Sequence, residues 1–273
     1  MTLSRKKILA VVVLVLAVTG LALLFAPTHT RQGVDFVVTV RELPAYEKAL
    51  DFVQRDIKYR ALAATITQGR RTELERLMAV YEWTRRNIRN IPEGFPVVDD
   101  HVWHIIVRGY GADDQKADVF TTLATYAGIP AFWTLLGTER HRAALPISLA
   151  RVNGRWIVAD VGAGVIFTDA HGLPVPVEEI ARDRRLVTAV AGNRRYYGLP
   201  YAAYFGSICS TGVPRTLRAE KQMLWPRLLF ESWALLRRVN LGADAEIPLC
   251  AGLALPTGTR VQSRRQRDDA PAD

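Results

Sequence analysis

The strongest pattern in the chain is an uncharged apolar run near its start, from Ile8 to Ala26, which follows Arg5, Lys6 and Lys7. About 20 apolar residues are enough for a helix to cross a bilayer. The basic flank favours the cytoplasm, so the rest of the chain is expected on the outer side. A cleaved signal peptide is the alternative, but its apolar region is usually about 7–15 residues and ends in a small-residue cleavage site. The run ends in LLFAP, and we therefore expect an uncleaved anchor.

The next patterns predict a stalk, a strand and two helices. Residues 27–33 resemble a short stalk, and the following VDFVVTVREL predicts a strand. Leu43 to Ile57 and Thr72 to Ile88 have apolar residues at helical spacing, and the second helix is the more strongly indicated. Thr72 and Glu75 fit a capping box, in which each side chain bonds the backbone N–H of the other residue.

The middle of the chain predicts a helix followed by an antiparallel sheet. Gln115 to Tyr126 is the expected helix, and Gly128 is a plausible cap at its end. Three β-like runs follow: Ala131 to Gly137, Leu145 to Val152 and Arg155 to Gly162. Asn153-Gly154 is a strong hairpin turn between the last two. The order indicates an α+β layout rather than alternating βαβ units.

The C-terminal part is less regular. Val165 to Ala181 predicts a strand, a turn at His171-Gly172 and a short helix, and residues 192–214 are irregular. Glu220 to Val239 predicts a long apolar helix, for which burial in the core is the expected arrangement and a membrane or partner surface the alternative. The tail from Gly258 is expected to be disordered.

Charge and cysteine content add two expectations. The 273-residue chain has a net charge of +9. Its basic residues are scattered rather than interleaved with aromatic residues, so we expect no nucleic-acid partner. Cys209 and Cys250 would meet an oxidising space outside the cell, where they form either a disulfide or two buried thiols.

Gly109 to Phe120, GYGADDQKADVF, places a glycine-bracketed turn before a helix that opens with two aspartates. Many chains present a nucleophile in this way, yet this stretch has no Cys and no Ser. With GIPA at 128–131 and NGRW at 153–156, it resembles the transglutaminase-like superfamily. In that family G-x-G-x-C-D-Q opens the central helix, a Gly-Ile-Pro-Ala-like turn ends it, a His begins a strand, and an Asp follows a Gly-x-Trp turn.

The resemblance covers roughly residues 74–182 and rests on motifs in a fixed order. The matching positions are Gly109, Gly111, Asp114, Gln115, Ala117, Gly128, Ile129, Pro130, Ala131, Asn153, Gly154, Arg155, Trp156 and Asp160. It implies a transglutaminase-like, papain-like α+β domain, with a helix packed on an antiparallel sheet.

The departures from the family pattern concern its catalytic residues. The resemblance places the nucleophilic Cys on Asp113 and the His near Leu145, and only the acidic residue is kept, as Asp160. A carboxylate is a poor nucleophile toward an amide, and Leu145 cannot hold a proton. His141 is the nearest preceding histidine, in an unmatched context. We therefore expect an inactive domain in which Asp113 caps the central helix.

Two other kinds of site are possible from the sequence. DDHVWH holds the candidate zinc ligands Asp99, Asp100, His101 and His104, but the following IIV indicates a strand, on which the two histidines would not share a face. Paired carboxylates of a glycosidase-like site could come from Asp113, Asp114, Asp118 and Asp160. Acidic residues at a helix start are more often caps or solvated, so we expect no metal and no cofactor.

Aromatic residues near the end of the chain predict a partner-binding surface. The residues proposed for it are Tyr196, Tyr197, Tyr201, Tyr204, Trp225 and Trp233. Trp225 and Trp233 are about two helical turns apart, and Trp is favoured at interfaces.

These patterns divide the chain into six segments. They are a basic cytoplasmic N-terminus (1–7), a transmembrane helix (8–26), a stalk and first strand (27–42), the transglutaminase-like domain (43–190), a C-terminal extension with the long apolar helix (191–257) and a disordered tail (258–273).

We expect a non-catalytic accessory or scaffolding subunit of a respiratory, photosynthetic or export assembly. It would be anchored in the bilayer of a bacterial inner membrane by residues 8–26, with its main domain in the periplasm and other subunits as partners. The alternative is an amide or glycan hydrolase with a rearranged site around Asp113 and Asp160.

Overall fold

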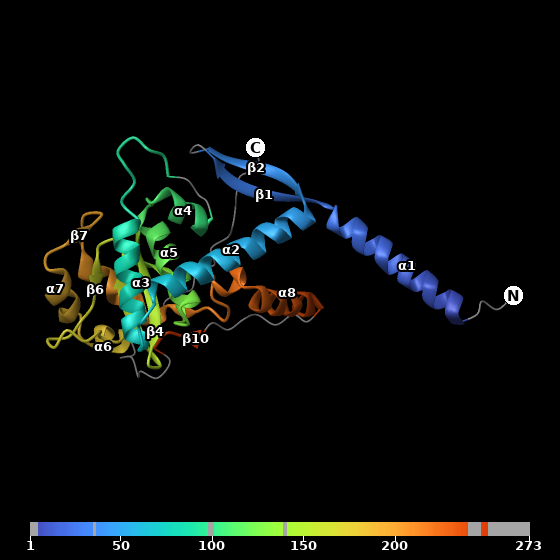
Figure 1. The fold of residues 1–273 in the computed structure, drawn as a ribbon. Helices are drawn as coiled ribbons and strands as arrows, with labels where there is room; N and C mark the ends of the chain where they lie inside the picture. The colour runs from blue at the N-terminus through green and yellow to red at the C-terminus, as the bar shows by residue number, and fades with distance from the viewer. Residues whose placement is uncertain (1–4, 35–36, 98–100, 139–140, 240–246, 251–273) are drawn as a thin grey trace.

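The computed structural model describes residues 5–34, 37–97, 101–138, 141–239 and 247–250 (Figure 1). Its first helix, α1 (Arg5–Leu24), extends away from the rest of the molecule, as expected for the apolar run. Lys6–Leu24 is long and apolar enough to cross a membrane, a property that a signal sequence would share. The remaining described elements form an α+β domain.

A β-hairpin stands where the sequence predicts a stalk, which corrects that expectation. β1 (Pro27–Val34) pairs antiparallel with β2 (Val37–Pro44) over its whole length, with Pro27 opposite Pro44. The hairpin returns the chain to the end of α1, where the backbone N–H of Ala45 donates to the carbonyl of Ala26 at 2.9 Å. The helix α2 (Ala45–Ile66) starts there and continues beyond its predicted end at Ile57.

The capping box at the start of α3 (Glu73–Asn87) is confirmed. Thr72 Oγ1 accepts a hydrogen bond from the Glu75 backbone N–H at 3.1 Å, and Glu75 Oε2 accepts from the Thr72 N–H at 3.1 Å. These two bonds satisfy backbone donors that the first turn of a helix leaves unpaired.

Two further helices lead to the sheet. The expected strand after His101 is wrong, because α4 (Val102–Arg108) is a short helix with Val102 and Ile105 buried. α5 (Asp113–Tyr126) is the predicted central helix and is buried along most of its length. Gly128 follows it with a φ of +82°, a left-handed conformation that glycine adopts without steric cost.

The predicted antiparallel sheet is confirmed, in the order β3-β4-β5-β6. Its strands are β3 (Ala131–Thr138), β4 (His141–Val152), β5 (Arg155–Asp160) and β6 (Val165–Ile166). Asn153 and Gly154 turn β4 into β5 with φ values of 49° and 79°, as the Asn-Gly signal requires.

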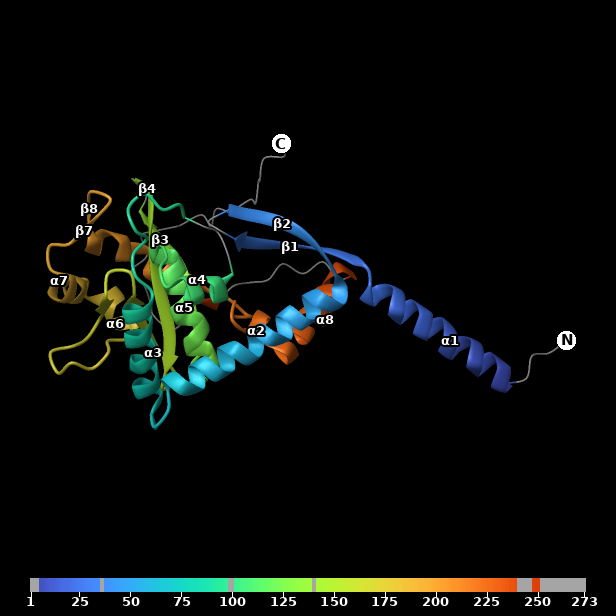
Figure 2. The ribbon, with the colours of Figure 1, turned by 45° about the horizontal axis from the view of Figure 1, so that its top comes forward.

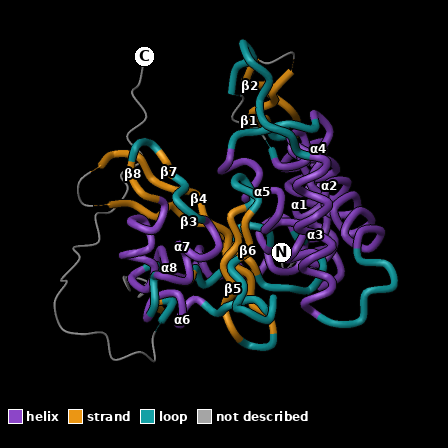
Figure 3. Tube along the Cα trace, turned by 90° about the vertical axis from the view of Figure 1, so that its left-hand side faces the viewer, coloured by secondary structure: helices purple, strands orange, loops and turns teal. Residues whose placement is uncertain are grey.

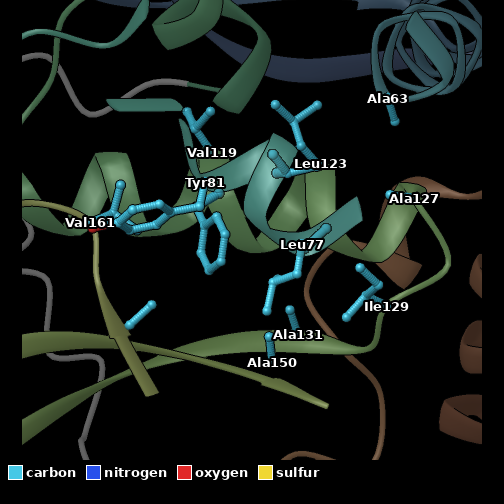
Figure 4. Close-up of a cluster of buried hydrophobic side chains, with 14 of the residues drawn as sticks. Ala63, Leu77, Tyr81, Val119, Leu123, Ala127, Ile129, Ala131, Ala150 and Val161 are labelled. Atoms are coloured by element: carbon cyan, nitrogen blue, oxygen red, sulfur yellow. The ribbon is translucent and has the colours of Figure 1, made fainter. Parts of the chain in front are cut away.

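Alternation along the strands builds two apolar clusters, one on each face of the sheet. Ala150 and Ala159 pack in the cluster formed with α2, α3, α4 and α5, whereas Leu149 and Val158 pack in the cluster on the other face. Figure 4 shows side chains of the first cluster between α5, α3 and the sheet, among them Leu77, Tyr81 and Ala131. Figure 3 shows the strands between α2–α5 on one side and α6 and α7 on the other.

Residues beyond 190 help to form the second cluster, so the predicted domain boundary does not coincide with a break in packing. This face carries short elements: α6 (Val177–Arg182), α7 (Arg185–Ala191), β7 (Arg195–Tyr196), β8 (Leu199–Pro200), η1 (Tyr201–Ser210), β9 (Gly212–Val213), η2 (Glu220–Gln222) and β10 (Ile247–Pro248). Of the two states that the sequence leaves open for Cys209 and Cys250, the structure has the disulfide.

The long apolar helix is not a core helix, which corrects the expected arrangement. α8 (Leu224–Val239) leaves Leu224, Trp225, Leu228, Leu229 and Trp233 exposed. The predicted tail, 258–273, lies outside the described residues.

Candidate functional site

The turn before α5 is held by backbone hydrogen bonds to the end of α3. The Arg89 N–H donates to the carbonyl of Gly109 at 2.9 Å, and the Gly111 N–H donates to the carbonyl of Arg89 at 3.0 Å. Gly109 ends α4 with a φ of 75°. A Cβ at Gly111 would lie 3.0 Å from Cβ of Gln115. The two glycines therefore let the chain turn tightly and place Asp113 at a fixed point.

Asp113 is the first residue of α5 rather than its cap, which corrects the predicted role. The cap position is Ala112, whose backbone N–H donates to Gln115 Oε1 at 3.1 Å. The Asp113 carboxylate lies in the first turn, where negative charge suits the helix dipole. Its Oδ1 is 3.5 Å from Nζ of Lys116, an ammonium group that is almost fully buried.

Lys116 is a residue of this site that the sequence interpretation missed. Its ammonium group also donates a hydrogen bond to Oδ1 of Asn90. A buried charge needs a partner, and Asp113 supplies the opposite charge. The signal available in the sequence was the spacing of three residues between Asp113 and Lys116, which places the two side chains on one helix face.

The Asp113 side chain lies directly against the turn that follows β5. A Cβ built on Gly162 would be 2.5 Å from Oδ1 and 2.6 Å from Cγ of Asp113. Real Cβ atoms do not approach heavy atoms this closely, so the contact depends on glycine at position 162. It brings the predicted nucleophile position close to Asp160.

Asp160 is buried and has hydrogen-bond partners for both carboxylate oxygens. Oδ2 accepts from the Tyr201 hydroxyl at 2.5 Å, and Oδ1 accepts from the Ala163 backbone N–H at 2.8 Å. Burial raises the pKa of Asp160 above its ordinary value, and the nearby Asp113 charge raises it further, against the lowering by the two hydrogen bonds. Asp160 therefore anchors Tyr201 and the turn at Ala163.

Leu145, near which the resemblance places the family's histidine, does not face the Asp113 side of the sheet. Leu145 is buried in the cluster on the face of the sheet that α5 does not cover. Its neighbours Ala144 and Pro146 point the other way and line a hollow together with Asp113. Neither Ala144 nor Pro146 can exchange a proton. The backbone of His141 pairs with Thr138 at the start of β4.

The hollow beside Asp113 has a volume of about 480 Å³. Its lining residues are Asn90, Ile91, Gly111, Ala112, Asp113, Asp114, Leu135, Ala144, Pro146, Tyr196 and Tyr197. Among these described lining residues there is no Cys, Ser, Thr or His. The described lining thus contains neither the thiol nor the imidazole of the family's catalytic pair.

The predicted aromatic surface is divided between places that lie far apart. Tyr201 and Tyr204 are buried, which contradicts their prediction as partner-binding residues. Tyr196 and Tyr197 line the hollow, whereas Trp225 and Trp233 stand exposed on α8. Figures 1 and 2 place β7, which carries Tyr196, and α8 at opposite sides of the domain.

The other candidate carboxylates each have a partner within the domain. Asp118 is buried, and its Oδ2 lies 2.8 Å from an Arg218 guanidinium nitrogen. Oδ1 of Asp114 accepts a hydrogen bond from the Gln115 N–H at 2.9 Å.

Of the four candidate metal ligands, the structure describes only the two histidines. The rings of His101 and His104 are 5.9 Å apart, edge to face, and Asp99 and Asp100 lie outside the described residues. In the described parts of the chain, no group of three or more His, Cys, Asp and Glu side chains is placed to hold a metal ion.

Residues 60–161 match the family model of the transglutaminase-like superfamily. The match includes α3, the turn before α5, α5 itself and the strands β3, β4 and β5. The chain therefore carries a transglutaminase-like domain, as the sequence motifs imply. No curated protein matches the chain at a significant level.

Three solved structures are similar to parts of the chain. A "putative cysteine protease" from Cytophaga hutchinsonii is 17% identical, with a TM-score of 0.35 over 44% of this chain and 42% of the other. A "putative protease" from Parabacteroides distasonis is 15% identical, with a TM-score of 0.30 over 55% and 40%. A structure named "a TGase" is 9% identical, with a TM-score of 0.32 over 62% and 50%.

The chain thus spans half or less of the length of these three structures. At such low TM-scores, none of them bears on the arrangement or the activity of this chain.

Proposed function

We propose that this chain is a non-catalytic, membrane-anchored accessory or scaffolding subunit of a membrane or envelope complex, built on an inactive transglutaminase-like domain. The observation that carries the proposal is the composition of the hollow at the start of α5. Its lining, as described, offers carboxylates, aromatic rings and apolar groups but no thiol, aliphatic hydroxyl or imidazole. Covalent acyl transfer depends on an activated nucleophile with a base beside it.

The contacts of the Asp113 side chain support the same proposal. Its carboxylate is paired with Lys116 and lies against Gly162, so it is used to hold α5 and the turn after β5 together. Asp160 likewise holds Tyr201 and Ala163. Where the family pattern has a nucleophile and the residue that orients its base, this chain has two structural carboxylates.

A hydrolase with a rearranged site around Asp113 and Asp160 is the rival proposal. Two catalytic carboxyls about 5–10 Å apart, both open to a substrate, are needed for glycoside hydrolysis. Asp160 is 3% exposed, and both of its oxygens accept hydrogen bonds from the protein. A substrate would have to displace Tyr201 to reach it, which argues against this alternative.

The proposed setting is a bacterial inner membrane that α1 crosses, with the domain in the periplasm. Lys6 and Lys7 stand at the start of α1, and cytoplasmic positions favour such basic flanks. The Cys209–Cys250 disulfide agrees with an oxidising compartment. Tyr196 and Tyr197 at the hollow are the residues proposed to contact a partner subunit.

The test is purification of the full chain from its native membrane in mild detergent, followed by mass spectrometry of the proteins that accompany it. We expect a stoichiometric set of membrane proteins. Asp113→Asn should keep this set, whereas Tyr197→Ala should lose part of it. Leu173→Ala is the matched control, because Leu173 is also well exposed but does not line the hollow.

The opposite pattern would support the hydrolase. A chain that purifies alone, and that cleaves peptides or glycans in a manner abolished by Asp113→Asn, contradicts the proposal.

A further inference from the structure

The helix α8 exposes a continuous apolar face. Trp225, Leu229 and Trp233 follow one another at intervals of four residues and therefore lie along one side of the helix. They are 73%, 62% and 61% exposed, respectively. Leu228 lies next to this line and is also exposed. A soluble domain rarely leaves such a face uncovered unless something binds it.

The opposite face of α8 is charged. Arg227 pairs with Glu231 at 2.6 Å, one helical turn further on. The Lys221 ammonium group stands 4.4 Å from the ring centre of Phe230, and the Arg227 guanidinium 6.0 Å from it. A face of Trp and Leu opposite a face of charged residues is typical of a helix that lies in the plane of a membrane interface.

The position of α8 relates this face to the membrane anchor. In Figures 1 and 2, α8 lies on the side of the domain from which α1 departs. α8 packs against η2, which in turn contacts α2. The first residue of α2, Ala45, donates a backbone hydrogen bond to Ala26, just after α1. A membrane crossed by α1 would begin on this side of the molecule.

Charge favours an anionic lipid surface over an apolar protein groove. The chain carries a net charge of +9, and Lys221 stands just before α8, near the ion pairs Arg218–Asp118 and Arg227–Glu231. Basic residues near an anionic leaflet strengthen the attraction of a peripheral helix to it.

We propose that α8 lies in the lipid–water interface of the membrane that α1 crosses, with Trp225, Leu229 and Trp233 inserted at the headgroup–acyl boundary. The inference rests on the anchoring stated under the proposed function. It adds a second, peripheral contact that fixes the orientation of the domain on the membrane, because one helix and a hairpin alone would leave the domain free to tilt.

The test uses two labelled variants of the full chain, reconstituted into vesicles with and without phosphatidylglycerol. Leu229→Cys and Glu231→Cys are two residues apart, about 200° around the helix axis, so they sample opposite faces. Both native residues are exposed, so neither substitution opens the core. Each cysteine carries an environment-sensitive fluorophore, and quenching is measured with a nitroxide lipid and with aqueous iodide.

We expect the label at position 229 to shift to the blue, to be quenched by the nitroxide lipid and to be several-fold less accessible to iodide than the label at position 231. The contrast should increase when phosphatidylglycerol is present. Adding Trp225→Ala and Trp233→Ala to the Leu229→Cys variant should increase the quenching of its label by iodide.

Two outcomes overturn the inference. Equal iodide quenching at both positions would mean that α8 stays in water. Protection of position 229 without quenching by the nitroxide lipid would mean that protein, a second copy or another chain, covers the face. Either result leaves the co-purification test of the proposed function standing, because that test does not depend on α8. A chain absent from the vesicles altogether would instead remove the anchoring on which both rest.

Discussion

At the scale of single residues, Asp113 stands where the family pattern has its nucleophile, and its carboxylate makes contacts within the fold. The turn at Gly109 and Gly111 presents it at the start of α5, facing the end of β5. There its carboxylate meets the Lys116 ammonium group at 3.5 Å and the backbone at Gly162. A carboxylate is stabilised at this place by the helix dipole and by the opposite charge, so aspartate suits the position structurally.

The contact between Asp113 and Gly162 leads to a prediction on stability. Gly162→Ala should lower the free energy of unfolding by about 1–3 kcal/mol, because the new methyl group overlaps the Asp113 carboxyl group. In an Asp113→Ala background the cost should be smaller, since the two nearest atoms are gone. Gly137→Ala is the control: a Cβ there meets nothing within 4 Å. Urea unfolding of the four variants measures the coupling, and equal costs in both backgrounds would contradict the contact.

The buried Asp160 carboxyl predicts a pH dependence. Its pKa is raised by burial above the ordinary 3.8, so between 3.8 and the raised value the folded chain holds a proton that the unfolded chain has lost. Its contribution to stability is therefore greatest at low pH and decreases as the pH rises through this window. The unfolding free energy of the native chain minus that of Asp160→Asn should therefore fall as the pH rises through this window. A difference that grows with pH would show that the hydrogen bonds from Tyr201 and Ala163 outweigh burial.

At the scale of elements, local sequence signals set where helices end and strands turn, whereas packing sets whether an element is buried. The ends of α3 and α5, and the β4–β5 turn, follow from Thr72, Gly128 and Asn153-Gly154, whose preferences are local. The role of α8 is set by what lies next to it. Its apolar sequence suits a core, yet α5 already fills the space between α3 and the sheet, and η1 and α7 cover the other face.

The disulfide links two such elements and can be tested directly. Cys209 in η1 and Cys250 after β10 are 41 residues apart, and the segment between them contains α8. Closing a loop of this length is expected to stabilise the fold by about 2–4 kcal/mol. The melting temperature of the full chain in detergent should fall when a reductant is added. The double variant Cys209→Ser, Cys250→Ser should melt at the lower temperature with or without reductant, and a reductant effect on that variant would point to another cause.

At the scale of the whole molecule, the arrangement is an apolar helix followed by a domain whose nearest elements return to the end of that helix. The β1–β2 hairpin brings Ala45 back to Ala26, and the Phe25 and Tyr46 rings pack at 5.5 Å. The domain is thus held close to the end of α1 rather than on a loose stalk. With α1 in a membrane, as proposed, this geometry would set the height of the domain above it.

The proposed anchor predicts a definite membrane topology. The protein should remain in the membrane fraction after alkaline carbonate extraction and should keep its N-terminal residues, as determined by intact mass. Alkaline phosphatase fused after Asp273 should be active, because that enzyme folds in the periplasm. A mature chain that starts near Pro27 and washes off the membrane would identify residues 8–26 as a cleaved signal sequence instead.

The sequence by itself determined the membrane-span pattern, the order of helix and strands, the capping box and the transglutaminase-like motifs. Each of these rests on periodicity or on the conformational preference of a few neighbouring residues. The tertiary structure decided the rest: that Leu145 faces away from Asp113 while Ala144 and Pro146 face it, that Tyr201 is buried on Asp160, and that α8 is uncovered. A shift of one residue reverses the face of a strand, and burial depends on which distant elements fill the neighbouring space.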